Sequence, residues 1–310
     1  MEKNSKNILS SLLYSGKFIL CIFTYTGRKM MNKKQINLIV LATRDNIANC
    51  RVLETGEKIS LRLSSYQLFE IAPGEIATID IKKIWEFGNN KYISGELIDH
   101  QIKVHLLDLK PLKLTDWDFW DPMEEFEEER DENDQIIQET DDYYKAIIKA
   151  GKRPCYEMEQ VVPGDMDLEA DGPMLDAIYY KDIGEIGKAQ DILMDELIMD
   201  LRCLDAHAHL GNFMFDSWPE KAIIHYNIGM KIGHLSLPED FNGVLLWSLI
   251  DNRPFLRCMH GYGLCLWKLK RFKEAEKVFE RILWLNPPDN QGVCFIIYPV
   301  KDKKPWREDY

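Results

Sequence analysis

The stretch from Phe255 to Asn290 spaces its small, aromatic and proline residues as a pair of crossing helices requires. In a unit of roughly 34 residues, small residues stand at positions 8 (Gly263) and 20 (Ala275), Phe279 at 24 and Pro287 at 32. Small side chains let two helices approach closely, and an aromatic ring fills the groove between them. Proline ends the second helix because it lacks an N–H and clashes with the preceding turn. The spacing predicts a helix-turn-helix unit, which needs neighbours to bury its apolar face.

Two more units align with this one on the small residue of the second helix. Ala189 and Ala222 lie 33 residues apart, but Ala222 and Ala275 lie 53 apart, so an insertion that includes Leu235–Asn252 interrupts the period. This is the spacing of a tetratricopeptide repeat, whose stacked helix pairs form a binding scaffold. The other two diagnostic positions recur as Leu193 and Tyr226 (position 24), and as Ala177 and then Leu210 or Gly211 (position 8).

Four stretches of the C-terminal half read RPCYEMEQVVPGD (153–165), LRCLDAHAHLGNFMFD (201–216), LIDNRPFLRCMHGYGLCLWKLKRF (249–272) and ILWLNPPDNQG (282–292). In these words the chain resembles a group of bacterial cytoplasmic proteins described only as tetratricopeptide-repeat proteins. The resemblance implies a helical repeat fold, a cytoplasmic location and the binding of a protein or peptide in the concave groove. It implies no particular chemistry. The 53-residue spacing departs from the regular repeat and argues against a long superhelix.

From Gln35 to Leu114 the apolar residues recur with a period closer to 2 than to 3.6, which indicates strands. The turn clusters Thr55-Gly56-Glu57 and Gly88-Asn89-Asn90 separate strand-like runs. Short strands at this density predict a small barrel of the SH3 or OB type over residues 31–114. The predicted strands are Ile36–Ala42, Ala48–Leu53, Lys58–Leu63, Glu75–Phe87, Lys91–Ile98 and Gln101–Leu109.

Aromatic and basic residues gather around one predicted hairpin of this barrel. Small barrels often bind oligonucleotides or peptides, so the group could form a stacking platform with basic flanks. A barrel also needs interior aromatics whatever it binds, and core aromatics with solvated lysines are the favoured alternative. The candidate barrel surface consists of Lys82, Lys83, Trp85 and Tyr92, with Phe87 and Lys91 beside them.

An acidic segment over residues 115–140 is predicted to link the two parts. Residues 116–142 hold 14 acidic side chains and one basic side chain, a net charge of −13 against −12 for the whole chain. Such a run normally stays extended and solvated, but exposing large aromatics to water is costly. We expect its aromatics to dock onto the chain's own domains, in preference to the segment masking a basic surface of the barrel. They are Trp117, Phe119, Trp120 and Phe126.

The N-terminal residues and the cysteines bear on location. Ile8–Phe23 is apolar, but it is short for a membrane span and Lys17 interrupts it. No small-x-small cleavage site follows it, so we favour translation from Met30 or Met31 over a membrane anchor. Seven scattered cysteines without a CxxC pair fit reduced thiols in the cytoplasm. The net negative charge argues against tight non-specific DNA binding.

Cys203–Asn212 reads CLDAHAHLGN and contains the Asp-x-His-x-His pattern of amidohydrolase metal sites. That pattern works at the end of a strand in a (β/α)8 barrel, which needs roughly 200 residues or more, whereas 101 residues follow His209. On a helix, residues two apart diverge by about 200°, so His207 and His209 cannot share a metal. Cys203 and His207 could share one, but we expect a buried structural histidine. We predict no cofactor and no catalytic constellation.

Polar groups that helix packing does not need are candidate partner contacts. Arg253 could grip a carboxylate in a bidentate fork. Asn252 could contact the partner too, or it could cap a helix that has Pro254 in its first turn, and the stretch Asp289-Asn290-Gln291 is similarly polar. The candidate partner-binding residues are Asn252, Arg253, Lys268, Lys270, Arg271 and Lys273.

The sequence therefore predicts an α+β chain. A leader (1–30) precedes the small N-terminal β-barrel (31–114), the acidic aromatic linker (115–140), an all-α tetratricopeptide-like domain (141–300) and a tail (301–310). We expect an interaction scaffold that binds a protein or peptide segment in the helical groove. The alternatives are a nucleic-acid-associated regulator that uses the barrel and, least favoured, a metal-dependent hydrolase centred on His207 and His209. A membrane partner is expected only if the leader is translated.

Overall fold

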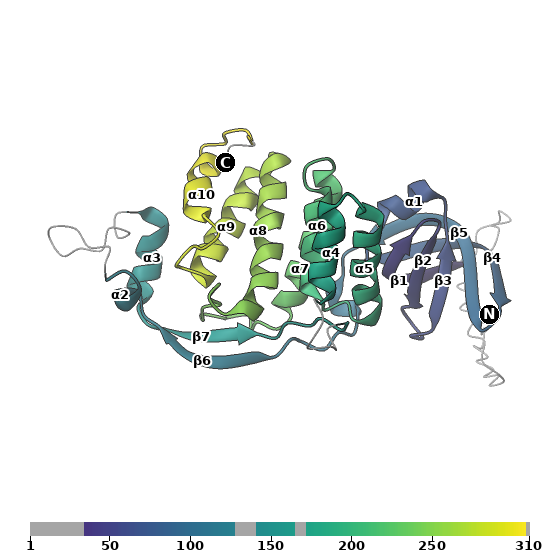
Figure 1. Cartoon of the computed structure of the whole chain (residues 1–310), viewed down its shortest axis with the longest axis horizontal. Helices are drawn as coiled ribbons and strands as arrows, with labels where there is room; N and C mark the ends of the chain where they lie inside the picture. The colour runs from purple at the N-terminus through teal and green to yellow at the C-terminus, as the bar shows by residue number, and fades with distance from the viewer. Residues whose placement is uncertain (1–33, 128–140, 165–171, 308–310) are drawn as a thin grey trace, which may run out of the picture. The chain divides into compact units, whose positions relative to one another are not determined.

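Five strands at the start of the described chain close into a barrel in the computed structural model, which describes residues 34–127, 141–164 and 172–307 (Figure 1). The order around the barrel is β1-β2-β3-β5-β4, with β3 and β5 parallel and the other neighbours antiparallel. Alternate residues such as Leu38, Leu61 and Ile79 fill the interior. The elements are β1 (Gln35–Arg44), β2 (Ile47–Val52), β3 (Lys58–Arg62), α1 (Ser65–Glu70), β4 (Ile76–Phe87) and β5 (Asn90–Gln101).

Five of the six predicted strands are confirmed, and the sixth is wrong. β5 itself extends to Gln101, and beyond it Val104–Leu106 forms the short 3-10 helix η1 instead of a strand. A sixth strand would find no free edge in the barrel, because β1 and β4 already pair with each other. Gly95 is required in β5, since a Cβ there would overlap the carbonyl oxygen of Asp80 on β4.

The chain leaves the barrel through β6 (Leu114–Trp120), which pairs with β7 (Arg153–Met158) in an antiparallel two-stranded ribbon. The prediction that residues 115–140 form only a linker is therefore wrong for residues 115–120, because they belong to a strand that pairs with β7. The structure also differs from an all-α half beginning at residue 141, because β7 lies within it. Residues 128–140 of the predicted linker lie outside the described residues.

The aromatics of the acidic segment divide into two kinds. Trp120 and Phe126 are buried and pack edge to face, and Phe126 does the same with Tyr144, so docking is confirmed for these two. Trp117 and Phe119 are 53% and 57% exposed. The flanking helices are α2 (Pro122–Glu125) and α3 (Asp142–Ala150).

From residue 172 on, the described chain contains three helix pairs, each with a short turn between its two members, followed by one more helix (Figure 1). Short turns make the two members of each pair antiparallel neighbours. The pairs are α4 (Pro173–Asp182) with α5 (Ile186–Met199), α6 (Leu204–Met214) with α7 (Pro219–His234), and α8 (Arg253–Lys268) with α9 (Phe272–Leu285). The last helix is α10 (Val293–Lys301).

The residues that the spacing singled out lie at the crossings of these pairs. A Cβ on Gly263 of α8 would lie 2.6 Å from the ring of Phe279 on α9, so a glycine lets the two helices meet there. In the middle pair, a Cβ on Gly211 would lie 2.7 Å from the ring of Tyr226. The small residues of the second helices, Ala189, Ala222 and Ala275, are all fully buried.

The insertion between the second and third pairs ties the ribbon to the helices. Val244 forms a parallel bridge with Cys155 of β7, its N–H donating to the Pro154 carbonyl (2.9 Å) and its own carbonyl accepting from the Tyr156 N–H (3.0 Å). The Leu245 N–H donates to the carbonyl of Leu285, the last residue of α9 (2.7 Å). The insertion is therefore hydrogen-bonded to β7 on one side and to the end of α9 on the other, and we call this junction the seam.

Asn252, just before α8 and the last residue of the 3-10 helix η3 (Ile250–Asn252), holds this seam from inside. Its Oδ1 accepts from the Met158 N–H at 2.7 Å, and its Nδ2 donates to the carbonyls of Tyr156 and Leu246, each at 3.0 Å. Asn252 occupies the predicted N-cap position of α8, with Pro254 in the first turn, but its side chain makes no capping bond to the helix. Because the side chain is fully buried, Asn252 is not a surface residue that a partner could contact. Backbone groups of β7 and of the insertion use the hydrogen-bonding groups of the Asn252 side chain instead.

The barrel packs on the helical half through β1 and α5. Ile39 and Leu41 of β1 lie in one buried cluster with Leu193 and Leu197 of α5, and Arg44 pairs with Asp195. The described residues from 34 onward accordingly form one compact unit. The predicted leader lies outside the described residues, and within these no helix is both long and apolar enough to cross a bilayer.

Candidate functional site

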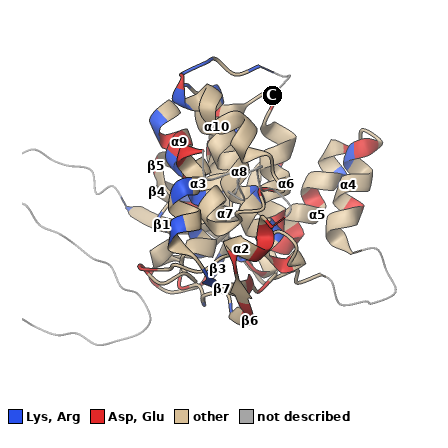
Figure 2. Cartoon of the chain, turned by 90° about the vertical axis from the view of Figure 1, so that its left-hand side faces the viewer, with Lys and Arg blue, Asp and Glu red and all other residues tan. Residues whose placement is uncertain are grey.

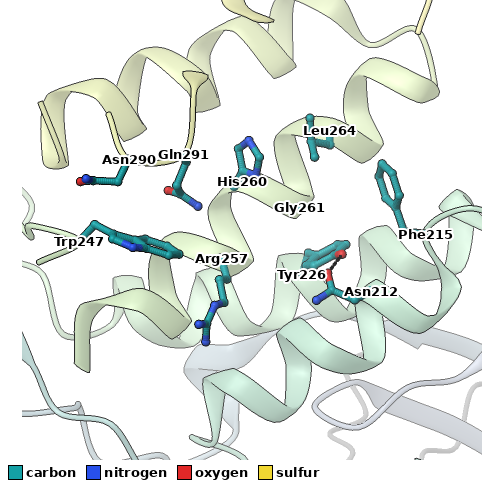
Figure 3. A pocket seen from close by; sticks show the side chains of 10 residues that line it. All are labelled: Asn212, Phe215, Tyr226, Trp247, Arg257, His260, Gly261, Leu264, Asn290 and Gln291. Atoms are coloured by element: carbon teal, nitrogen blue, oxygen red, sulfur yellow. Dashed lines mark hydrogen bonds between the residues drawn. The ribbon is translucent and has the colours of Figure 1, made fainter. Parts of the chain in front are cut away.

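A cavity of about 340 Å³ lies beside α8. Figure 3 shows the side chains that line it, where the insertion and the loop after α9 approach this helix. Gly261 gives it depth, because a Cβ at this position would overlap the ring of Tyr226. The lining comes from α6 and its end (Asn212, Phe215), α7 (Tyr226), the insertion (Trp247), α8 (Arg257, His260, Gly261, Leu264) and the loop before α10 (Asn290, Gln291).

Two arginines one helical turn apart stack on the indole at one side of the cavity. The guanidinium carbons of Arg253 and Arg257 lie 5.4 and 5.6 Å from the ring centre of Trp247. Arg253 Nε also donates to the Trp247 carbonyl at 2.9 Å, which fixes the loop to α8. Arg257 Nη1 donates to Asp205 at 2.8 Å, and the Arg257 side chain remains 36% exposed. Arg257 therefore presents a fixed cation at the edge of the cavity.

Two buried polar atoms of the lining lack a partner in the described part of the chain. They are His260 Nε2 and Gln291 Oε1. Burial lowers the pKa of His260 to about 4, so the ring is neutral at pH 7. Gln291 Nε2 donates to the Leu256 carbonyl (3.3 Å), which orients the amide. Leaving a buried polar atom unpaired costs free energy, and a bound group that donates to Gln291 Oε1 and pairs with His260 would remove this cost.

Asn212 adds an amide of fixed orientation on the opposite side of the cavity. Its Oδ1 accepts from the Tyr226 hydroxyl at 2.5 Å (Figure 3). This bond uses the oxygen and leaves the NH₂ group as the donor that can face a ligand. The lining therefore combines one cation, neutral hydrogen-bonding groups and the apolar side chains of Phe215 and Leu264.

The residues predicted as one partner surface lie at two ends of α8. Arg253 begins the helix, whereas Lys268 ends it, and 16 residues of α-helix span about 24 Å. Lys268 is used within the protein, since its Nζ donates to the Phe215 carbonyl (3.2 Å) and lies 4.2 Å from the Phe215 ring centre. Arg271 is held by Glu274 through two bonds of 2.8 and 2.6 Å. Lys270 and Lys273 are exposed in the turn and at the start of α9, away from Arg253.

Sequence reasoning did not single out Arg257 and His260. Arg257 follows Arg253 by four positions, so the helical repeat alone places the two on one face. His260 gives no such signal, because its lack of a partner depends on the loop around Gln291, more than thirty positions later. Gln291 itself belongs to the polar stretch 289–291 noted in the sequence, in which Asp289 caps α10 by accepting from two of its backbone N–H groups.

The barrel aromatics form a second cluster, on the outside. Trp85 of β4 and Tyr92 of β5 stack with ring centres 5.4 Å apart and planes 10° apart. The Arg62 guanidinium lies 5.9 and 5.8 Å from these two rings, and Lys83 Nζ lies 5.4 Å from Trp85. The favoured alternative, that these rings fill the core, is wrong, because Ile93 fills the barrel interior and its neighbour Tyr92 points outward.

Lys82 does not join this cluster. Its Nζ lies 3.2 Å from Glu96 Oε2 on β5, so its charge is already paired. Arg62, which sequence reasoning missed, joins instead because β3 pairs in parallel with β5. Nothing in the local sequence of β3 indicates that pairing.

A cavity of about 530 Å³ adjoins this cluster between β2, β3 and the β4–β5 turn. Ser60 lies in its wall and stands opposite Tyr92 in the β3–β5 pairing. Its polar lining includes Asn49, Glu57, Lys58, Ser60, Asn89, Asn90 and Lys91, with Leu41 and Ile198 at the side of the helical half. Glu57 pairs with Lys91.

The two histidines of α6, His207 and His209, contact other groups of the protein. His207 is fully buried, with Nε2 3.2 Å from the Leu201 carbonyl, and burial lowers its pKa to about 4. His209 Nε2 lies 3.9 Å from Asp205, which Arg257 also contacts. The described residues contain no group of three or more His, Cys, Asp or Glu side chains placed to hold a metal ion.

A comparison of the chain with protein-family models, curated proteins and solved structures found no match. The resemblance to tetratricopeptide-repeat proteins therefore stays a prediction.

Proposed function

We propose that this protein is a binding module that holds a segment of another polypeptide against α6 and α8, in a stack of tetratricopeptide-like helix pairs. One observation supports the proposal best. The cavity beside α8 gathers an exposed guanidinium and two buried polar atoms without partners, His260 Nε2 and Gln291 Oε1. Unpaired buried polar atoms lower stability, and here two of them meet a guanidinium in one cavity, where a bound group could pair with all three.

The chemistry of the lining favours an acidic segment in extended conformation. A carboxylate of the segment meets Arg257, which Asp205 and Trp247 hold in place. A backbone N–H or a primary amide of the segment donates to Gln291 Oε1, and apolar atoms cover Phe215 and Leu264. A volume of about 340 Å³ suits one or two side chains, so the rest of the segment lies across the helix surface.

Selection from a displayed library of random peptides tests this proposal. We expect the full chain to enrich peptides that contain Asp or Glu, and an Arg257→Ala variant to lose that enrichment. Lys273→Ala is the matched control, because Lys273 is exposed on α9 outside the cavity. Peptides that bind the wild type and the Arg257→Ala variant equally well would place the binding site elsewhere.

The barrel supports a second candidate function, the binding of single-stranded nucleic acid. The observation that favours it is the outward stack of Trp85 and Tyr92 with Arg62 and Lys83, next to the polar cavity on β2 and β3. The strand order and the helix between β3 and β4 are those expected for an OB-type barrel, which binds on this side. Aromatic stacking accepts any base, and the cations meet the phosphates.

Fluorescence anisotropy with labelled oligo-dT and oligo-U tests the second candidate. Stacking on an aromatic residue contributes about 1–3 kcal/mol per base, so Trp85→Ala should weaken binding by about fivefold to 150-fold. Tyr66→Ala is the control, because this tyrosine is 75% exposed on α1 and outside the cluster. Failure to bind either oligonucleotide in low salt would remove this candidate.

A further inference from the structure

A further cavity adjoins the one on β2 and β3, at the junction of the barrel with the helical half. It has a volume of about 340 Å³. Leu41, Lys58 and Ile198 line both cavities, so the two are neighbours. In the further cavity, α5 and the turn after it form one wall, and barrel strands with the segment after η1 form the other. We call the two cavities together the junction groove.

The outer face of β3 leads from the aromatic stack of the barrel into this groove. Arg62, Ser60 and Lys58 alternate with buried residues of β3, so the three share the outer face. The Arg62 guanidinium lies beside the rings of Trp85 and Tyr92, whereas Lys58 lines both cavities. Four residues of strand span about 13 Å, so the two cations stand in one row that runs away from the stack.

The row of cations continues across the sheet towards the helical half. Arg51 of β2 stands opposite Lys58 in the register, and its Nη2 donates to the Leu107 carbonyl at 2.7 Å. This bond holds the guanidinium beside the segment after η1, where Lys110 is exposed and lines the further cavity. Arg51, Lys58 and Lys110 form no ion pair with the described residues. Three cations without a carboxylate partner therefore share one groove.

Carboxylates also line the groove, but two of the three are paired. Glu57 pairs with Lys91, and Asp200 pairs with Arg202. Asp108 is the third carboxylate of the lining. The two cavities together are lined by five basic and three acidic side chains, so the lining has a net charge of +2.

The acidic segment of the chain contributes nothing to this lining. Residues 116–142 have a net charge of −13, and none of the described residues among them lines either cavity. Figure 2 shows red residues of this segment on α2. The groove therefore has a positive lining although the whole chain has a net charge of −12.

We propose that single-stranded nucleic acid runs through the junction groove, with bases on the stack of Trp85 and Tyr92 and phosphates on Lys58, Arg51 and Lys110. The helical half then forms one wall of the nucleic-acid site, through α5 and the turn after it. This inference rests on the second candidate function and extends it beyond the barrel. A row of cations that begins at an aromatic stack suits a strand better than an acidic peptide, because a strand supplies both bases and regularly spaced negative charges.

Fluorescence anisotropy of labelled oligo-U at several salt concentrations tests the phosphate contacts. For single strands, the logarithm of the affinity falls with the logarithm of the salt concentration by about 0.7 per phosphate contact. Lys58→Ala and Lys110→Ala should each reduce this slope by about 0.7. Trp85→Ala should weaken binding and keep the slope, because it removes no charge. Lys273→Ala, which changes the net charge equally but lies on α9, should alter neither.

The outcomes separate this inference from the candidate function on which it rests. If no oligonucleotide binds at low salt, both are overturned. If binding depends on Trp85 but both lysine variants keep the wild-type slope, the strand stays on the barrel and this inference alone is overturned. Unlabelled polyglutamate that competes as well as unlabelled oligo-U would assign the groove to an acidic peptide and would overturn it too.

Photo-crosslinking tests whether the strand reaches the helical half. Oligo-U that carries one 4-thiouridine, placed at successive positions, should form cross-links to residues 108–110 and 198–202, which mass spectrometry of the digested full chain identifies. These residues line the further cavity. Cross-links confined to the barrel strands would contradict a path through the junction groove.

Discussion

Asn252 shows how much one buried amide can hold together. It joins β7, the insertion and the start of α8 through three hydrogen bonds. Replacement by Ala would leave the Met158 N–H and two carbonyls buried without this partner, and each unpaired group costs roughly 1–3 kcal/mol.

We therefore expect Asn252→Ala to lower the free energy of unfolding by about 3 kcal/mol or more, measured by urea denaturation. Asn290→Ala is the control at an exposed amide and should change it by less than about 0.5 kcal/mol. An Asn252→Ala variant as stable as the wild type would show that the seam tolerates the loss.

Residue-scale expectations succeeded where both partners lie in one helix pair. Gly263 and Phe279 meet within 16 positions, so spacing alone predicts their contact. The side-chain partners of Asn252 and Lys268 were missed because Met158 and Phe215 lie 94 and 53 positions away. No local pattern indicates that a polar side chain will be used by such a distant backbone group.

The helices of the stack differ in how many neighbouring helices they pack against and in how many of their residues are buried. α4 packs against α5, and its outward face is exposed, whereas α8 contacts α6, α7 and α9 and buries most of its residues. Local opening costs least where few apolar contacts are broken.

Amide hydrogen exchange measured by mass spectrometry should therefore show α4 exchanging faster than α8. Equal protection of the two helices at low concentration would contradict the ranking.

The elements that sequence reasoning missed are those defined by distant pairing. β6 was assigned to a linker because acidic residues dominate it, but pairing with β7 satisfies its backbone. β7 lies more than thirty residues further on, inside the part expected to be helical. The helix pairs and five barrel strands were predictable, because their hydrophobic periods arise within each element.

At the scale of the whole molecule, buried histidines tie stability to pH. Burial lowers the pKa of His207, His234 and His260 to about 4 and that of His225 to about 3, with the nearby His207 contributing to the last shift. The unfolded chain binds protons at these histidines near pH 6.5. Because the folded pKa values are lower, their contribution to stability is present above pH 6.5 and is lost as the pH falls towards 4.

We expect the free energy of unfolding to fall by about 5 kcal/mol between pH 7 and pH 5.5, as four sites protonate in the unfolded chain. His100 acts in the opposite sense, because its hydrogen bond to Glu75 raises its pKa, so its contribution is present below pH 6.5 and lost as the pH rises through the folded value. Urea denaturation at several pH values measures the balance. A His260→Gln variant should reduce the slope, and a stability that does not change over this range would contradict the burial of these rings.

The most direct test of the peptide-binding proposal is isothermal titration calorimetry of a library-selected acidic peptide with three proteins: the wild type, Arg257→Ala and Trp85→Ala. If the cavity beside α8 is the binding site, Arg257→Ala should raise the dissociation constant at least about fivefold, as the loss of a central anchor worth more than about 1 kcal/mol does. Trp85→Ala, on the outer face of the barrel, should leave it unchanged. An affinity that survives Arg257→Ala and is lost in Trp85→Ala would show that the barrel, and not the helical stack, binds the peptide.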